Sequence, residues 1–163
     1  MKEVFNQMHS ESNTGKYQLL VRKWHHERGL GIPYVQKTID TNEMCCIRWL
    51  ATAENIEKTG LADRFPKLEE DEFILENVYT LERFRSKGVQ TSSNMYKITQ
   101  GMGLSRIKGQ VAEDNIIELR ALKGWDTKVS ERVLERHLFF RVTRKSLERY
   151  DPPIPITIPG ENE

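Results

Sequence analysis

The sequence predicts a mixed α/β fold in which helices cover a sheet. Segments with apolar residues at helical spacing alternate with short β-prone runs, and the chain of 163 residues is the size of one domain. The order expected along the chain is helix, hairpin, strand, helix, strand, helix and two final strands.

The N-terminal third supplies a lead-in, a helix and a hairpin. Residues 1–15 are polar without clear periodicity, so we expect a loose lead-in. Two β-prone runs, 34–39 and 44–51, flank Asp40-Thr41-Asn42, which suits a turn. The helix between lead-in and hairpin is predicted from an apolar stripe at i, i+3, i+4 and i+7, formed by Tyr17, Leu20, Val21 and Trp24.

The middle of the chain contains the strongest strand. Residues 53–70 carry many charges, Gly60 and Pro66, and predict a mobile surface excursion with one helical turn near its start. Residues 73–80 (FILENVYT) are apolar on both faces except for Glu76 and Asn77, which is typical of a central strand.

The C-terminal half continues with alternating elements. Helical spacing predicts a helix from Val89 to Met102, and alternation predicts a strand over 106–112. Asp114 suits the start of a short helix that ends at Gly124. Two strands are expected near 128–134 and 137–143, and the proline-rich residues 151–163 are expected to form neither a regular ladder nor a helix.

Composition argues against several classes of function. Lysine plus arginine (25) balances aspartate plus glutamate (24), so no overall field favours nucleic acid. No apolar stretch approaches the roughly 20 residues of a membrane helix, and no signal peptide is evident. The four histidines include no i, i+4 pair, so no metal site is expected. We expect a cytoplasmic protein without nucleic acid or membrane as partner.

A loop with phosphate-binding character joins the predicted strand 73–80 to the predicted helix. Free N–H groups where a loop enters a helix favour an anion, and Gly88 allows close approach. Arg83 lies alongside and adds positive charge. An ordinary turn with solvated cations is the alternative. The loop reads Arg85-Ser86-Lys87-Gly88-Val89-Gln90-Thr91.

The stretch VYTLERFRSKGVQTSSNM, which contains this loop, resembles a motif of the GNAT superfamily of acetyl-CoA-dependent N-acetyltransferases, with the pattern Arg/Gln-x-x-Gly-x-Gly/Ala. Arg85 and Gly88 match the pattern, and Gln90 replaces its second small residue. The run VAEDNIIELRALKGWD resembles the second signature of that family. The resemblance implies a GNAT-like, mostly antiparallel central sheet flanked by helices, in one acyltransferase-like domain over 16–150 followed by a tail.

The resemblance also implies a reaction: transfer of an acetyl group from acetyl-CoA to a primary amine, of a small molecule or a protein lysine, without a metal. A homodimer is compatible with it. The net charge of −6 over residues 54–82, from nine acidic and three basic residues, would attract a cationic acceptor. By the same resemblance, the pantetheine arm would lie along Val78, Tyr79 and Thr80, the diphosphate would lie in the loop of Arg85, Ser86, Lys87, Gly88, Val89, Gln90 and Thr91, and the thioester end would contact Asn115.

Two residues are candidates for the chemistry of transfer. Glu76 interrupts an apolar strand, where burial would raise its pKa and suit a general base; a carboxylate paired with a cation or facing solvent is the alternative. A backbone N–H of Tyr79 or Thr80 is the candidate donor to the thioester carbonyl. Ala121 and Leu122 stand where many family members have a tyrosine acid, so the hydroxyl of Tyr79 or Tyr96, or a water molecule, is a candidate replacement, and the spacing selects none of them.

The missing tyrosine leaves a second interpretation open. The chain would then be a degenerate module that binds CoA or a protein partner without catalysis. Arg48, on a predicted strand, either pairs with an acidic loop residue or faces the acceptor pocket, and we favour the pair.

Overall fold

The protein is a mixed α/β chain that divides into two compact units, Met1–Gly109 (unit 1) and Gln110–Glu163 (unit 2). The structure, a computed structural model, describes residues 1–11, 16–60, 62–89, 93–125, 127–138 and 141–158. The sequence predicted one domain over 16–150. The strand expected over 106–112 pairs with its neighbour only to Lys108, close to the end of unit 1, and the domain bounds 16–150 stay a prediction.

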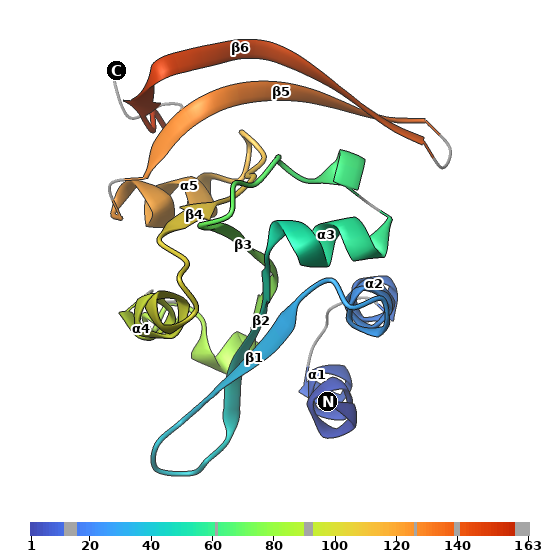
Figure 1. Cartoon of the computed structure of the whole chain (residues 1–163). Helices are drawn as coiled ribbons and strands as arrows, with labels where there is room; N and C mark the ends of the chain where they lie inside the picture. The colour runs from blue at the N-terminus through green and yellow to red at the C-terminus, as the bar shows by residue number, and fades with distance from the viewer. Residues whose placement is uncertain (12–15, 61, 90–92, 126, 139–140, 159–163) are drawn as a thin grey trace. The chain divides into compact units, whose positions relative to one another are not determined.

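Unit 1 is built on a four-stranded, mostly antiparallel sheet (Figure 1). β1 pairs antiparallel with β2, β2 pairs antiparallel with β3, and β3 pairs parallel with β4. The predicted hairpin and the predicted central strand are both confirmed. The strands are β1 (Ile32–Lys37), β2 (Met44–Ala51), β3 (Glu72–Thr80) and β4 (Arg106–Lys108).

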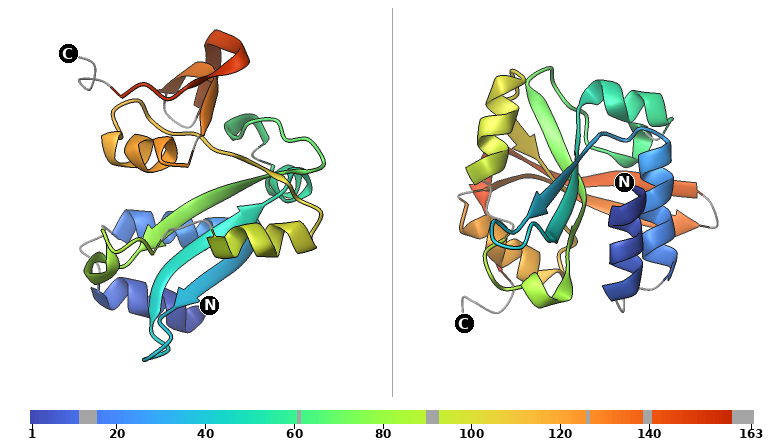
Figure 2. Two further views of the ribbon diagram at one scale, coloured as in Figure 1. Left: turned by 90° about the vertical axis from the view of Figure 1, so that its left-hand side faces the viewer. Right: turned by 90° about the horizontal axis from the view of Figure 1, so that it is seen from below.

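Helices cover both faces of this sheet (Figure 2). On one face, α1 (Lys2–Glu11) and α2 (Lys16–Glu27) lie side by side, and on the other lies α4 (Ser93–Gly101). Two clusters of buried side chains fill these layers. The first contains Phe5, Met8, Met44, Ile47, Trp49, Tyr79 and Leu81; the second contains Leu50, Phe73, Met95 and Leu104.

The N-terminal residues are not the loose lead-in that the sequence predicted, because Lys2–Glu11 forms α1. Phe5 and Met8, one helical turn apart, are both buried against the sheet, and the Phe5 ring stacks near Trp49 at 6.4 Å between ring centroids. Met1, Val4, Phe5 and Met8 fall at i, i+3, i+4 and i+7, so the helical period is present in the sequence and the prediction of a loose lead-in overlooked it. The partner that stabilises α1 comes from β2, far along the chain.

α2 forms where expected, but a different face is turned inward. Leu20 and Trp24 are exposed, at 62% and 37%. The inward positions include Arg22, whose guanidinium lies over the Tyr79 ring at 5.1 Å, and His26, whose ring lies 6.3 Å from that of Trp49. Planar polar groups here replace the aliphatic contacts that the apolar stripe predicted.

Residues 53–70 pack rather than form the mobile excursion that the sequence predicted. They contain α3 (Ala53–Thr59) and a 3₁₀ turn, η1 (Ala62–Arg64). Ile56 and Leu68 are buried with Ile74 of β3 in a third cluster. The charges that suggested a surface loop lie on the outer side of these elements, where Glu54 pairs with Lys58 at 2.6 Å.

Unit 2 consists of a helix and a long hairpin: α5 (Ile116–Lys123), β5 (Lys128–Leu138) and β6 (Arg141–Pro155). Cross-strand ion pairs join its strands, including Arg144 to Glu135 at 2.9 Å and Arg149 to Glu131 at 3.2 Å. Residues 151–155 belong to β6, which corrects the expectation of an irregular tail. Pro152 and Pro153 fall in a break in register, where no ladder N–H is needed.

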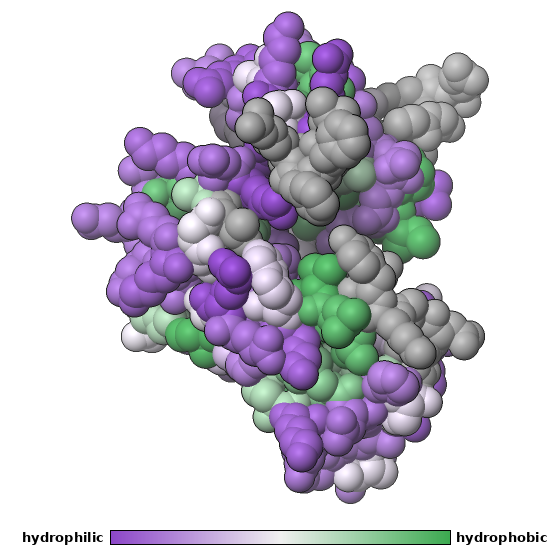
Figure 3. All heavy atoms as spheres, turned by 90° about the vertical axis from the view of Figure 1, so that its right-hand side faces the viewer, coloured by the Kyte–Doolittle hydropathy of each residue, from purple (hydrophilic) through white to green (hydrophobic). Residues whose placement is uncertain are grey.

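The surface in Figure 3 is mostly hydrophilic, with hydrophobic residues gathered in smaller areas. This agrees with a chain in which 30% of residues are charged. None of the helices in the described residues has the length and hydrophobicity of a membrane-spanning segment.

A buried carboxylate joins β3 to β4. Glu72 has a 4% exposed side chain; its oxygens lie 2.7 Å from Lys108 Nζ and 3.3 Å from Arg106 Nη1, and one accepts the Glu69 N–H at 2.9 Å. Burial alone would raise the pKa of Glu72, but the Lys108 hydrogen bond, the Glu69 amide and the two cations outweigh it and hold the pKa below 4.5.

We expect Glu72→Gln to lower the free energy of unfolding at neutral pH by about 2 kcal/mol, because the charge-assisted contacts of the carboxylate are lost. A depressed folded pKa gives stability that is present above the ordinary value of 4.5 and lost as pH falls through the folded value. Urea unfolding across this range should therefore show the variant and wild type converging in acid. Glu70→Gln, an exposed neighbour, is the control; a difference that persists in strong acid contradicts the assignment.

Candidate functional site

The edge of β3 that faces β4 is paired over only part of its length. Glu72, Phe73 and Ile74 pair with the three residues of β4, whereas β3 continues to Thr80. In the described part of the chain, residues 75–80 thus have no strand partner on that side. A strand that runs past its neighbour leaves backbone N–H and C=O groups for a ligand with amides of its own.

A β-bulge lies within this extended part of β3. Ile47 of β2 is opposite Tyr79 and Trp49 is opposite Glu76, so Arg48 alone faces two residues of β3. Asn77, one of those two, has a left-handed backbone with φ of 52°. Bulges of this kind bend a strand and re-aim its side chains, and they are frequent beside active sites.

His25 of α2 lies against the bulge, and the sequence assigned it no role. Its Nδ1 is 2.7 Å from Nδ2 of Asn77. Burial lowers the pKa of His25 below 6.5, with Arg64 and Arg22 acting in the same direction and the Asn77 hydrogen bond opposing them. Because the Asn77 amide nitrogen can only donate, Nδ1 of the neutral imidazole accepts this hydrogen bond and its ring proton is on Nε2. Helix periodicity gave no signal for His25, because its partner comes from a distant strand.

Glu76 lies on the same face of the sheet as α2. It is directly opposite Trp49, and opposed residues project to the same side, where Trp49 also meets His26. The side chain of Glu76 is half-buried. The predicted base is thus adjacent in sequence to Asn77, which the structure joins to His25.

The other predicted residues of β3 differ in placement. Tyr79 is 5% exposed, and its ring belongs to the core cluster under α1. This favours a packing role for the ring over a role as proton donor. Thr80 is also buried, and its hydroxyl donates to Cys46 Sγ at 3.5 Å. Val78, within the bulge, is half-buried, so Val78, Tyr79 and Thr80 would act through their backbone groups.

The predicted phosphate loop forms an exposed turn after β3 and a short 3₁₀ turn, η2 (Glu82–Phe84). Ser86 and Gly88 have left-handed backbones, with φ of 58° and 68°. Arg85, Ser86, Lys87 and Gly88 are exposed and Val89 is half-buried. Residues 85–89 precede α4 rather than forming its first turn, because the helix begins at Ser93; Gln90 and Thr91 lie outside the described residues.

The cations of this turn are held by neighbouring groups. Arg85 Nε donates to the Thr80 carbonyl at 3.1 Å, which ties the turn to the end of β3. Arg83 pairs with Glu43 at 2.5 Å, and Lys87 Nζ lies 5.7 Å from the centre of the Phe84 ring. The exposed positive charge is therefore positioned before any ligand binds.

Asn115 lies in unit 2, where it caps α5. Its Oδ1 accepts the backbone N–H of Glu118 at 3.3 Å, which is the ordinary use of asparagine at a helix start. The contact with a thioester that the resemblance implied for Asn115 stays a prediction.

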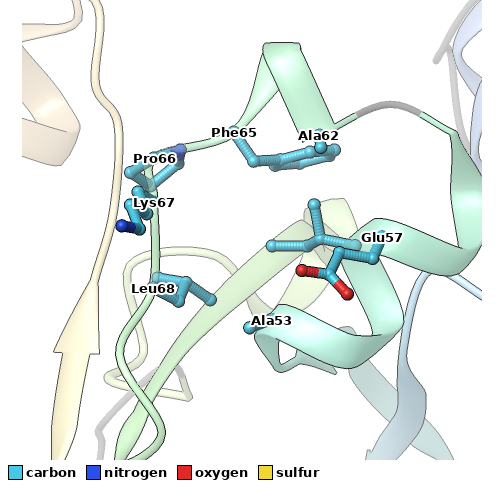
Figure 4. Close-up of a pocket in the computed structure, with 8 residues that line it drawn as sticks. Ala53, Glu57, Ala62, Phe65, Pro66, Lys67 and Leu68 are labelled. Atoms are coloured by element: carbon cyan, nitrogen blue, oxygen red, sulfur yellow. The ribbon is translucent and has the colours of Figure 1, made fainter.

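A cavity of about 190 Å³ lies between α3 and residues 62–68 (Figure 4). Ile56 and Leu68 form its buried part, and the Phe65 ring lies on its outer side. Its two charged lining residues, Glu57 and Lys67, are exposed. An apolar cavity whose charged lining residues are exposed has few polar groups that could orient a ligand, so we do not place the functional site there.

Three histidine, cysteine or acidic side chains do not come together anywhere in the described residues in a way that could hold a metal ion. No protein-family model matches the chain, and comparison with curated proteins and with solved structures gives no match. The functional argument therefore depends on the geometry of β3, its bulge and the turn after it.

We expect an NMR titration of the imidazole ring carbons of His25 to give a pKa below 6.5. Arg64→Gln should raise it towards that value, because one repelling charge is removed. Lys97→Gln, which changes an exposed cation on α4, is the control and should leave the midpoint unchanged. An equal effect of both variants would show that the local placement of His25 is wrong.

Proposed function

We propose that this protein binds acetyl-CoA along the part of β3 that extends past β4 and transfers the acetyl group to a primary amine. The observation that carries the proposal is the extension of β3 past β4, with a bulge at Asn77, directly before an exposed turn with a left-handed glycine. The sequence resemblance to GNAT acetyltransferases falls on this same segment. We accordingly propose a GNAT-like arrangement of the mostly antiparallel sheet.

The pantetheine arm of the coenzyme would lie along residues 75–80. It carries two amides, which can pair with the backbone of an extended strand as an added strand does. Such pairing needs no particular side chain. This fits a segment in which the side chains of Tyr79 and Thr80 are buried and which extends past the last residue paired with β4.

The diphosphate would lie in the turn of residues 85–89. Left-handed residues in a turn direct successive N–H groups to one point, a geometry that binds anions. Lys87 and Arg85 would supply the charge, and Arg85 is already fixed to the Thr80 carbonyl.

The transfer itself requires a neutral amine and a stabilised carbonyl oxygen. The amine nitrogen would attack the thioester carbon, forming a C–N bond; the C–S bond then breaks and the thiolate takes a proton. Glu76 would accept the proton that the amine releases. A backbone N–H of Tyr79 or Thr80 would stabilise the oxyanion. The acidic segment 54–82 supports a cationic acceptor.

We expect Gly88→Val to weaken CoA binding, measured by titration calorimetry, by about tenfold or more, equivalent to ~1.4 kcal/mol. A β-branched side chain at a φ of 68° strains the turn and obstructs the diphosphate. Gly60→Val is a matched control, because Gly60 has the same φ of 68° at the end of α3. If wild type binds no CoA, or if both variants bind equally, the proposed coenzyme site is wrong.

We expect Glu76→Gln to leave CoA affinity unchanged and to lower turnover at neutral pH by about 10²-fold, the usual contribution of a general base. Thiol release from acetyl-CoA with a panel of amines measures this. Glu70→Gln, an exposed acid on the same unit, should behave as wild type. Unchanged turnover would dismiss Glu76 as the base; CoA binding without turnover in wild type would instead favour a non-catalytic module.

A further inference from the structure

A second cavity in unit 1, of about 280 Å³, lies between α4 and the first two strands. α4 lies on the face of the sheet opposite α1 and α2 (Figure 2), and its residues Met95 and Ile98 line the cavity on that face. The described walls of this cavity include Tyr34, Gln36 and Lys37 of β1, Arg48 of β2, and Met95 and Ile98 of α4.

Arg48 is the unusual member of this lining. It is 4% exposed, yet its two hydrogen bonds go to uncharged groups: Nη2 donates to Gln36 Oε1 at 2.9 Å and to Cys46 Sγ at 3.5 Å. Within the described residues, no carboxylate comes within ion-pair distance of it. The sequence favoured a pair between Arg48 and an acidic loop residue, and the structure shows none in that part of the chain.

The acidic residue directly before β2 is paired with another cation. This residue, Glu43, lies 2.5 Å from Arg83. Lys37, also on the cavity wall, adds a second positive charge. The cavity therefore contains excess positive charge on its strand side and apolar side chains, Met95 and Ile98, on its helix side.

A buried guanidinium without a counter-charge is unfavourable, because desolvation costs several kcal/mol and arginine stays protonated. A counter-ion from outside the protein would remove this cost. The planar fork of arginine matches a carboxylate, which it can bind with two parallel N–H groups. Both hydrogen bonds of Arg48 to described residues use Nη2, so its Nε and Nη1 make none within that part of the chain.

We propose that this cavity binds a small organic acid, with its carboxylate on Arg48 and its apolar part against Met95 and Ile98. Ligand pockets usually measure about 300–1,000 Å³, so this cavity, of about 280 Å³ and thus just below that range, suits an acid of a few carbons rather than a nucleotide. The site goes beyond the proposed acetyl transfer and does not depend on it, since it uses none of residues 75–80 or 85–89.

The wild-type protein provides the first test. Binding of butanoate, hexanoate and benzoate is measured by saturation-transfer NMR and calorimetry beside the amide of each acid. At least one acid should bind about tenfold more tightly than its amide, because only the acid neutralises Arg48. If no acid binds in the millimolar range, or if acid and amide bind equally, the proposal is overturned.

The second test uses Arg48→Met, which keeps an unbranched apolar stem and removes the guanidinium with its charge. Arg48→Met should no longer bind the acid more tightly than the amide. Arg64→Met, a control at an exposed arginine of the same unit, should still bind the acid more tightly. Without ligand, Arg48→Met should have a thermal midpoint equal to or above that of wild type. If Arg48→Met folds and still binds the acid, the assignment to Arg48 is overturned. If this variant does not fold, the comparison of acid and amide binding by the wild-type protein decides whether the proposal stands.

CoA titration of the same variants separates this site from the proposed function. Arg48→Met should bind CoA as wild type does if wild type binds it. Loss of acid binding with CoA binding intact supports two independent sites, whereas an acid that CoA displaces overturns the assignment to the α4 cavity.

Discussion

The short contact between β3 and β4 is the constraint on which the candidate site depends. Glu72, buried and held by Arg106 and Lys108, fixes the two strands together at one end, and the pairing stops at Ile74. A longer β4 would occupy the edge of residues 75–80 with ladder hydrogen bonds. Because β4 is only three residues long, that edge is left for another group to pair with, and the bulge at Asn77 bends it.

The sheet of unit 1 separates two sets of polar side chains, one on each of its faces. On the α2 face, the bulge brings Asn77 to His25 and leaves Glu76 beside them. On the α4 face, Arg48 is buried next to a cavity. Both follow from the same bulge, since Arg48 is the β2 residue that faces the extra residue of β3. A cluster of buried apolar side chains packs against each of these two faces of the sheet.

Charge in this protein is organised locally rather than as a field. The overall charge is +1, and individual basic and acidic side chains pair with each other, such as Arg83 with Glu43 and Arg144 with Glu135. Surface pairs of this kind contribute little stability each. Their effect in the turn after β3 is to fix where the remaining positive charge lies, which lowers the entropy lost when an anion binds.

The mixed α/β class, the hairpin, the central strand and the loop after it follow from the amino-acid sequence, because period and turn chemistry are local properties. Tertiary packing decides which residues cover α1, that Tyr79 is buried and that His25 meets Asn77. Each of these depends on contacts between residues far apart in the chain. The environment of Arg48 is of the same kind: no spacing along one strand shows which charges its neighbours across the sheet already neutralise.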